Sequence, residues 1–172
     1  MSNFRSISPR ELSDNPFSLI GHDWMLVTSG NAEHFNTMTA SWGGVGFLWN
    51  KNVCYVYIRP QRYTYEFVEK NETLTLSFFS EKYRDALNFC GKHSGRDTDK
   101  CKATGLTPRA VGSCVAFEQA RLILRCRVLY KQDMLESAFL DKSLLSNYKN
   151  GDFHRAYVCE IEEILVSDSQ DA

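Results

Sequence analysis

Short apolar runs, several of them alternating in polarity and each followed by turn-forming residues, constrain the fold of this chain more than any other feature. The runs that we expect to be strands are residues 24–28, 36–42, 53–58, 73–79, 115–117, 120–130 and 156–166. The first three are joined by segments too short for the crossover that parallel strands need, which predicts an antiparallel meander. The number and spacing of the runs favour a mainly β protein, a β-barrel with inserted helices, over an α/β fold.

Caps and helical spacing predict the inserted helices. Ser8 followed by Pro9 is typical of a helix start, and residues 63–70 have helical spacing. Ser80 would cap a helix that runs to about Cys90, with Gly91 as its C-cap. Shorter helical pieces are expected at 101–104 and within 137–148.

The segments between these elements are expected to be turns and loops. Residues 21–23 and 49–52 read as turns, and residues 92–108 as a long polar loop. Gly43, Gly44 and Gly46 follow the second strand, where they would permit a bulge or a close backbone approach. The polar tail from Ser167 is expected to fray.

Composition bounds the class of protein. The chain has 172 residues and a formal net charge of −1, which favour one domain over residues 1–172 and exclude an obvious nucleic-acid surface. No apolar run reaches the roughly 20 residues that span a bilayer, and the N-terminus lacks the apolar core of a signal peptide. We therefore expect a cytoplasmic protein. The six cysteines form no CxxC pair, so reduced thiols and no metal site are expected.

Two arginines close to a predicted helix start suggest an anion site. Arg59 ends one predicted strand, Arg62 precedes the helix, and Thr64 adds a hydroxyl. Guanidinium groups and the amides of a helix N-terminus both favour phosphate. Taken by spacing alone, two solvated arginines that flank a proline turn are the commoner arrangement.

Two further stretches have the residue types of a ligand site. In a strand, Thr37, Thr39 and Ser41 would share one face, opposite Met38, Ala40 and Trp42, although many half-exposed strands alternate in this way. The loop from Lys92 to Lys100 mixes hydroxyls, glycine and cations, but its two aspartates partly cancel that charge and a solvated loop is the commoner case. A planar ring joined to a phosphate, as in FMN, would match the strand at residues 36–42 together with the segment from Arg59 to Thr64.

Three motifs, taken in order, resemble those of one family. They are Asn36-Thr-Met-Thr-Ala-Ser-Trp42, Arg59-Pro-Gln-Arg-Tyr-Thr64 and Ser94-Gly-Arg-Asp-Thr-Asp-Lys100. With them the chain is similar to flavin reductase-like and flavoredoxin proteins over residues 17–164. The resemblance implies an FMN-binding split barrel of Greek-key topology and a homodimer with non-covalent FMN near its interface.

The resemblance also implies which residues form the site. The residues that it assigns to cofactor binding are Thr37, Met38, Thr39, Ala40, Ser41, Trp42, Arg59, Arg62, Tyr63, Thr64, Phe79, Ser80, Lys92, Ser94, Gly95, Arg96 and Lys100. His154, just before the last strand, is the one candidate catalytic residue, and a merely solvated histidine is the alternative.

The activity that follows from the resemblance is electron transfer from NADH or NADPH through FMN to a small-molecule or protein acceptor. A flavoredoxin-type electron carrier and a non-catalytic FMN-binding module are the alternatives. An activity like that of pyridoxamine-phosphate oxidases fits the motifs less well. The absence of a Gly-x-Gly-x-x-Gly fingerprint argues against a Rossmann nicotinamide site but not against the use of NADH or NADPH.

Overall fold

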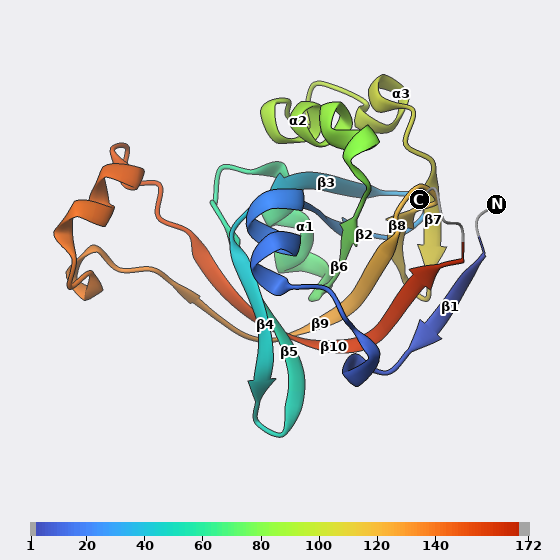
Figure 1. Ribbon diagram of the computed structural model, residues 1–172. Coiled ribbons are helices and arrows are strands. Elements are labelled where there is room, and N and C mark those ends of the chain that lie inside the picture. The colour runs from blue at the N-terminus through green and yellow to red at the C-terminus, as the bar shows by residue number, and fades with distance from the viewer. Residues whose placement is uncertain (1–2, 169–172) are drawn as a thin grey trace.

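A twisted antiparallel sheet forms most of the protein in the computed structural model, which describes residues 3–168 (Figure 1). Its strands run in the order β3-β2-β6-β9-β10-β5-β4, and β1 also pairs with β10. These strands are β1 Phe4–Ile7, β2 Met25–Gly30, β3 Phe35–Ala40, β4 Gly43–Leu48, β5 Lys51–Ile58, β6 Thr73–Phe78, β9 Leu122–Asp133 and β10 Arg155–Ser167. A separate hairpin joins β7 Pro108–Val111 to β8 Cys114–Phe117. The predicted mainly β, barrel-like fold is confirmed.

Short helices fill the connections between the strands. The helices of the described residues are α1 Tyr63–Asn71, α2 Arg84–Lys92 and α3 Lys100–Thr104, with 3₁₀ turns at Pro9–Glu11, Glu81–Tyr83, Glu136–Ala138 and Lys142–Tyr148 and a π-helix at Ser18–Asp23. The cap at Ser8 is confirmed, because its hydroxyl accepts from the backbone of Arg10 and Glu11 completes a capping box. The predicted turn at 21–23 is wrong, since those residues continue the π-helix.

The helix after β6 differs from its prediction at both ends. Ser80 makes no capping hydrogen bond, and the chain first forms a 3₁₀ turn before α2 begins. Gly91 lies inside the helix, whose C-cap is His93. A serine in sequence before a helix therefore does not guarantee a cap, because the 3₁₀ turn changes where the first free amides point.

The predicted meander is wrong in its third strand. β2 pairs with β3, but β5 pairs with β10 and with β4, a strand that the sequence did not predict. β4 contains the three glycines. A Cβ at Gly43 would lie 2.7 Å from the backbone oxygen of Tyr55, so only glycine lets the strands approach this closely at that position. The glycines thus belong to a strand, and Gly43 makes the close backbone approach that the sequence predicted.

Two apolar cores lie on opposite faces of the sheet. One fills the barrel with inward side chains such as Leu74, Leu124 and Tyr157, and Val68 of α1 packs into it. The other lies beneath α2 and the β7–β8 hairpin and includes Leu87 and Phe117. All six cysteines are free thiols, and those at 54, 90, 114, 126 and 159 are buried.

Residues 134–154, here called the arm, project from the barrel between the extended ends of β9 and β10 (Figure 1). The predicted helical turns within 137–148 are present there as 3₁₀ turns. The arm exposes Leu135, Leu140 and Leu144, and the β4–β5 hairpin exposes Phe47 and Trp49. Isolated apolar residues are normal on a surface, but a set on two projecting elements is typical of an interaction surface.

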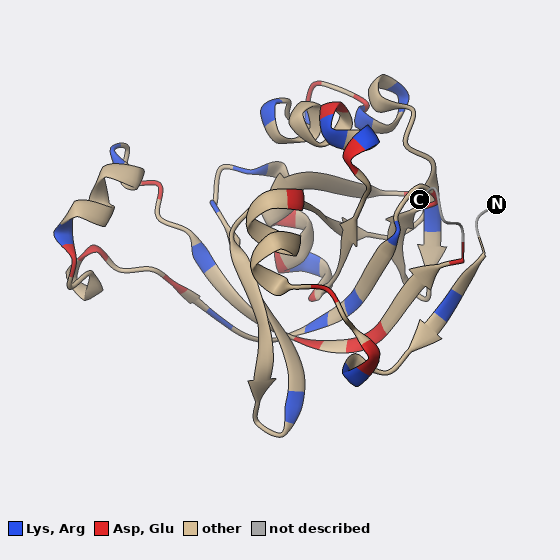
Figure 2. Cartoon of the chain, viewed as in Figure 1, with Lys and Arg blue, Asp and Glu red and all other residues tan. Residues whose placement is uncertain are grey.

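Charged residues on the barrel wall alternate in sign across neighbouring strands (Figure 2). Arg125 and Arg127 of β9 form ion pairs with Glu160, Glu162 and Glu163 of β10. Such cross-strand pairs support the register of the two strands. Within residues 3–168, no helix has the length and apolar character to cross a membrane. The predicted fraying from Ser167 falls mostly on residues 169–172, outside the described part.

Candidate functional site

Several cavities open along β3, an edge strand of the sheet, and one of about 200 Å³ is lined by the carboxylates Glu33 and Asp99 as well as by Lys100. Of two others, the first, which we call the cation cavity, has a volume of about 120 Å³. It is lined by Asn36, Met38, Gln61, Arg62, Tyr63, Thr64, Gly91, Lys92, His93, Ser94, Gly95 and Lys100. The second, the aromatic cavity, has a volume of about 170 Å³ and is lined by Met38, Thr39, Ala40, Ser41, Trp42, Tyr57, Arg59 and His154. Met38 lines both, so the two cavities meet over the middle of β3.

The cation cavity is lined by Arg62, Lys92 and Lys100, and none of them forms an ion pair with a carboxylate of the described residues. The Lys100 ammonium is buried and donates to the carbonyls of Thr37, at 2.7 Å, and Cys90, at 3.0 Å. Arg62 reaches the same Cys90 carbonyl at 3.5 Å. Burial, with Arg62 close by, lowers the pKa of Lys100 to about 8. Burial, with Arg59, likewise lowers the pKa of Arg62. An anion in this cavity would stabilise both cations.

The N-terminus of α1 opens into the same cavity. Arg62 is its N-cap and makes no side-chain capping bond, so the amides of Tyr63 and Thr64 keep their donor capacity, whereas that of Tyr65 donates to the Arg62 carbonyl. Thr64 is fully buried, and its hydroxyl accepts from the Asn36 amide at 2.7 Å. A hydroxyl that accepts in this way can still donate its own hydrogen to a bound oxygen.

Gly95 gives the loop after α2 its close approach to β3. A Cβ built at Gly95 would lie 1.8 Å from Oδ1 of Asn36 and 2.9 Å from its Cγ. Asn36 is buried and bonded to Thr64, so it has little freedom to move. Glycine at this position is therefore a steric requirement, and it brings Ser94 to the rim of the cavity.

The backbone of β3 supplies the wall between the cavities. The hydroxyl of Thr37 meets that of Thr28 at 2.8 Å, and Thr39 donates to the Leu87 carbonyl of α2, so the predicted hydroxyl face is turned into the protein. The Thr37 carbonyl, in contrast, points away from β2 toward Lys100. Because backbone groups of an antiparallel strand alternate, the N–H and C=O of Thr39 lie on the same free edge.

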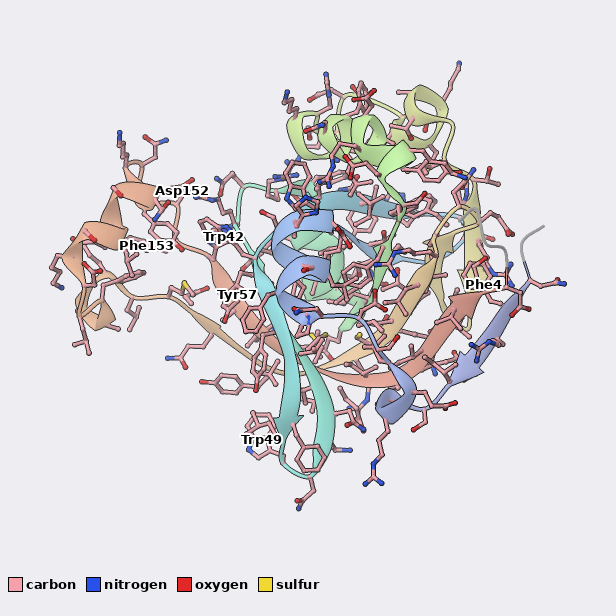
Figure 3. The ribbon with its side chains drawn as sticks, viewed as in Figure 1. Phe4, Trp42, Trp49, Tyr57, Asp152 and Phe153 are labelled. Carbon is pink, nitrogen blue, oxygen red and sulfur yellow. The ribbon has the colours of Figure 1, made fainter. Side chains whose placement is uncertain are left out.

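The aromatic cavity is lined by Trp42 and Tyr57 on the barrel (Figure 3) and by His154 of the arm. The ring of His154 lies 5.2 Å from that of Trp42, and its Nδ1 is 3.0 Å from the hydroxyl of Tyr148. Burial, followed by the positive charge of Arg59, lowers the pKa of His154 to about 4. His154 is therefore a neutral imidazole at physiological pH.

The two predicted arginines line different cavities. Arg62 lies in the cation cavity, whereas Arg59 lines the aromatic cavity and forms an ion pair with Asp152 of the arm. Arg59 also donates to the Asn147 carbonyl at 3.0 Å and lies over the ring of Tyr148 at 5.1 Å. The structure thus gives Arg59 a role in holding the arm against the barrel, and it does not bring the two arginines of the predicted phosphate clamp into one cavity.

The other predicted residues divide into three groups. The structure brings Met38, Thr39, Ala40, Ser41, Trp42, Arg62, Tyr63, Thr64, Lys92, Ser94, Gly95, Lys100 and His154 to the two cavities, while Thr37 contributes its carbonyl to Lys100. Arg96 lies outside both linings, paired with Glu66 and stacked over Tyr63 at 4.6 Å. Phe79 and Ser80 line a separate cavity of about 490 Å³ with Arg84 and Arg121. The structure does not bring them to β3.

Several residues of the site were not predicted. Asn36 stands within the first motif, but only the structure shows its bond to Thr64. Tyr57 and Gly91 line the cavities, and Tyr148 reaches them through His154. Alternation along β5 could have indicated Tyr57, whereas no local pattern links Tyr148 to His154.

The sequence over residues 17–172 matches the family model described as flavin reductase like domain. The match covers most of the chain, and the chain therefore belongs to the flavin reductase-like family. Among curated proteins, none matches the sequence significantly.

Solved structures share the fold at low sequence identity. An FMN-binding protein from Thermus thermophilus with bound p-hydroxybenzaldehyde is 20% identical, with a TM-score of 0.68 over 98% of this chain and 83% of that one. Flavoredoxin of Desulfovibrio vulgaris is 18% identical, with a TM-score of 0.67 over 95% and 76%. An FMN-binding domain of a flavin reductase-like enzyme from Shewanella baltica is 14% identical, with a TM-score of 0.68 over 96% and 78%. These likenesses confirm the split-barrel fold.

Proposed function

We propose that this protein is an FMN-dependent oxidoreductase that passes electrons from NADH or NADPH through FMN to an acceptor. One observation carries the proposal: a cavity with unneutralised cations and a cavity with aromatic walls meet at Met38 on a free strand edge. FMN has a phosphate at one end and a planar ring at the other, and the two cavities match these ends. The FMN-binding relatives of the same fold add support.

The donor set of the cation cavity fits a phosphate. Arg62 and Lys100 would supply positive charge, the first amides of α1 would donate along the helix axis, and the hydroxyls of Thr64 and Ser94 lie in the lining. A dianionic phosphate would compensate two cations that the protein has partly desolvated. Asp97 and Asp99 of the same loop are absent from this lining.

The aromatic cavity fits the ring system. The free backbone groups of Thr39 would hydrogen-bond to ring heteroatoms, while Trp42 and Tyr57 would shield the ring from water. Bound flavin supplies the hydride and electron chemistry itself. The side chains then bind and orient, and no acid or base on the protein is required. His154, neutral at physiological pH, would serve as a polar contact and not as a proton donor for the chemistry.

We also propose that the protein acts as a homodimer, in which the apolar side chains of the arm and of the β4–β5 hairpin meet a second copy. Phe47 is 68% exposed and Leu140 98% exposed, which is unfavourable for an isolated chain in water. Sedimentation velocity should show a dimer. Replacing Phe47 and Trp49 together by serine should shift it toward monomer, and an unchanged dimer would place the interface elsewhere.

The absorption spectrum of the purified protein, before and after anaerobic addition of NADH or NADPH, tests the activity. Flavin bands near ~370 and ~450 nm that bleach with the nicotinamide support the reductase, since the flavin performs the redox chemistry. Bands that persist until dithionite is added would replace it by an electron carrier of the flavoredoxin kind. A colourless protein that takes up no added FMN would refute both.

A further inference from the structure

Tyr148 is the one residue of the arm's 3₁₀ turn Lys142–Tyr148 that is buried, at 8% exposure. Its ring stacks on Phe153 with centroids 4.8 Å apart and meets Phe139 edge-on at 5.7 Å. Arg59, fixed by Asp152, covers the same ring. These contacts from the barrel and the arm hold the phenol in one place, so its hydroxyl has a defined direction.

That hydroxyl meets Nδ1 of His154 at 3.0 Å and the sulfur of Met134 at 3.6 Å. The hydroxyl has one hydrogen to donate, and an imidazole nitrogen is a much stronger acceptor than a thioether, so donation to Nδ1 is favoured over donation to Met134. Burial also raises the pKa of Tyr148, which therefore keeps its proton. Because His154 is neutral and Nδ1 accepts, the single ring proton is on Nε2.

His154 lines the aromatic cavity, and Nε2 is the ring nitrogen that is not bonded to Tyr148. Within residues 3–168, Nε2 has no hydrogen-bond partner. The described side-chain polar atoms that are both fully buried and without a partner are the hydroxyls of Ser77 and Ser80, so Nε2 is not among the fully buried atoms. Nε2 is therefore accessible, and the cavity that reaches His154 is the one bordered by Trp42 and Tyr57. The remaining charged groups nearby, Arg59 and Asp152, are paired with each other.

We propose that Tyr148 is a positioning residue that fixes His154 as an Nε2–H donor into the aromatic cavity, so that the molecule bound there presents a carbonyl oxygen to it. This inference rests on the proposed function for the identity of the bound molecule, but the tautomer of His154 is a property of the protein alone. The carbonyl belongs either to the flavin ring or to an acceptor that is reduced above it. The aromatic cavity thereby selects ligands by hydrogen-bond polarity as well as by shape.

Nitrogen-15 NMR of the ligand-free protein tests the tautomer. The chain has four histidines, and the variant His154→Gln identifies the relevant ring signals by their loss. The expected result for the unaltered protein at pH 7 is a protonated Nε2 and an unprotonated Nδ1. The variant Tyr148→Phe keeps the ring contacts with Phe153 and should shift His154 toward a mixture of tautomers. The exposed Tyr130, changed to phenylalanine, is the matched control and should leave the spectrum unchanged.

Protonated Nδ1 in the unaltered protein, or the same tautomer in Tyr148→Phe, would overturn the proposal. Either result would mean that the Tyr148 phenol does not determine the tautomer of the His154 imidazole. Thermal unfolding of Tyr148→Phe, compared with Tyr130→Phe, shows whether the arm still packs, so that a lost fold is not mistaken for a lost tautomer.

Binding and turnover then identify the source of the carbonyl. Riboflavin, which lacks the phosphate, isolates contacts to the ring, and a ring carbonyl predicts about three- to tenfold weaker riboflavin binding by Tyr148→Phe. Unchanged riboflavin binding with about three- to tenfold slower NADPH-dependent reduction of menadione, a quinone, assigns the carbonyl to the acceptor. If neither changes, the donor role is refuted. Failure of the unaltered protein to bind any flavin would refute the proposed function and the ligand assignment, while the NMR result would still decide the role of Tyr148.

Discussion

Replacing Gly95 by alanine would test whether the loop after α2 is held against β3 as tightly as the structure shows. The added Cβ would meet Oδ1 of Asn36 at 1.8 Å, far inside contact distance. Asn36 lies in the middle of the arrangement, because it is buried and donates to Thr64 at the N-terminus of α1. The substitution should therefore disturb the packing of the loop, β3 and α1 together.

The size of the effect follows from these contacts. Overpacking of a filled site costs about 1–3 kcal/mol. Displacing the Asn36 amide from Thr64 would remove a buried hydrogen bond worth about 1 kcal/mol. A loss of about 2–4 kcal/mol in a domain of this size lowers the melting temperature by about 2–4 °C for each kcal/mol. The same displacement moves Ser94 away from the cation cavity, so FMN affinity should fall by about tenfold or more, equivalent to ~1.4 kcal/mol.

Gly91 provides a matched control on the same cavity. A Cβ there would lie 3.4 Å from Cβ of Thr39, an ordinary contact, and the position is inside α2. Alanine within a helix is favoured over glycine by about 0.5–1 kcal/mol, so Gly91→Ala should be neutral or stabilising. Thermal unfolding without ligand and fluorescence titration with FMN measure both variants. Equal melting temperatures and equal FMN affinities for the two variants would refute the steric account of Gly95.

Three further predictions concern charge and thiols. Burial lowers the pKa of Lys100 to about 8 in the free protein and a bound phosphate would raise it, so FMN affinity should be full at pH 7 and fall above pH 8, whereas riboflavin affinity should not. A pH-independent FMN titration from pH 7 to 9.5 would contradict this. Replacing Arg62 by methionine should weaken FMN binding by about 10- to 100-fold, as for a lost charged hydrogen bond, but spare riboflavin, and equal losses for Arg96→Met would contradict the assignment. Native protein at pH 8 should react slowly with a thiol reagent, because burial raises the pKa of Cys101, the one partly exposed thiol, to about 11. Unfolding should expose all six thiols to the reagent. A fast reaction phase in the native protein would refute this prediction.

Local patterns in the sequence predicted the elements better than their partners. The spacing of Tyr63, Phe67 and Val68 predicted α1, and alternation from Leu122 to Cys126 predicted the inward face of β9, because these signals arise within one element. Strand pairing depends on contacts far apart in the chain. Nothing local in residues 43–46 distinguishes a glycine-rich turn from a strand that needs glycine to approach Tyr55.

The candidate site shows the same division. The motif around Arg62 and Thr64 indicated an anion-binding helix start, and the structure places both residues in one cavity. The spacing between Arg59 and Arg62 could not predict that Arg59 forms an ion pair, because its partner Asp152 lies in the arm, 93 residues away. Residue type and spacing thus indicated the chemistry, whereas tertiary contacts decided which cations stay free for a ligand.

The two helix ends beside β3 explain how Arg62 and Lys100 are held in place, although neither pairs with a carboxylate of residues 3–168. The C-terminal carbonyls of α2 carry partial negative charge, and that of Cys90 accepts from both Lys100 and Arg62. The N-terminus of α1, with partial positive charge, lies on the other side of the same cavity. A carboxylate would neutralise the cations fully and compete with a bound anion, whereas a carbonyl dipole orients them at little cost to their charge. The opposed helix ends therefore leave the positive potential of the cavity available to a phosphate, and the free edge of β3 continues from that cavity to the aromatic one.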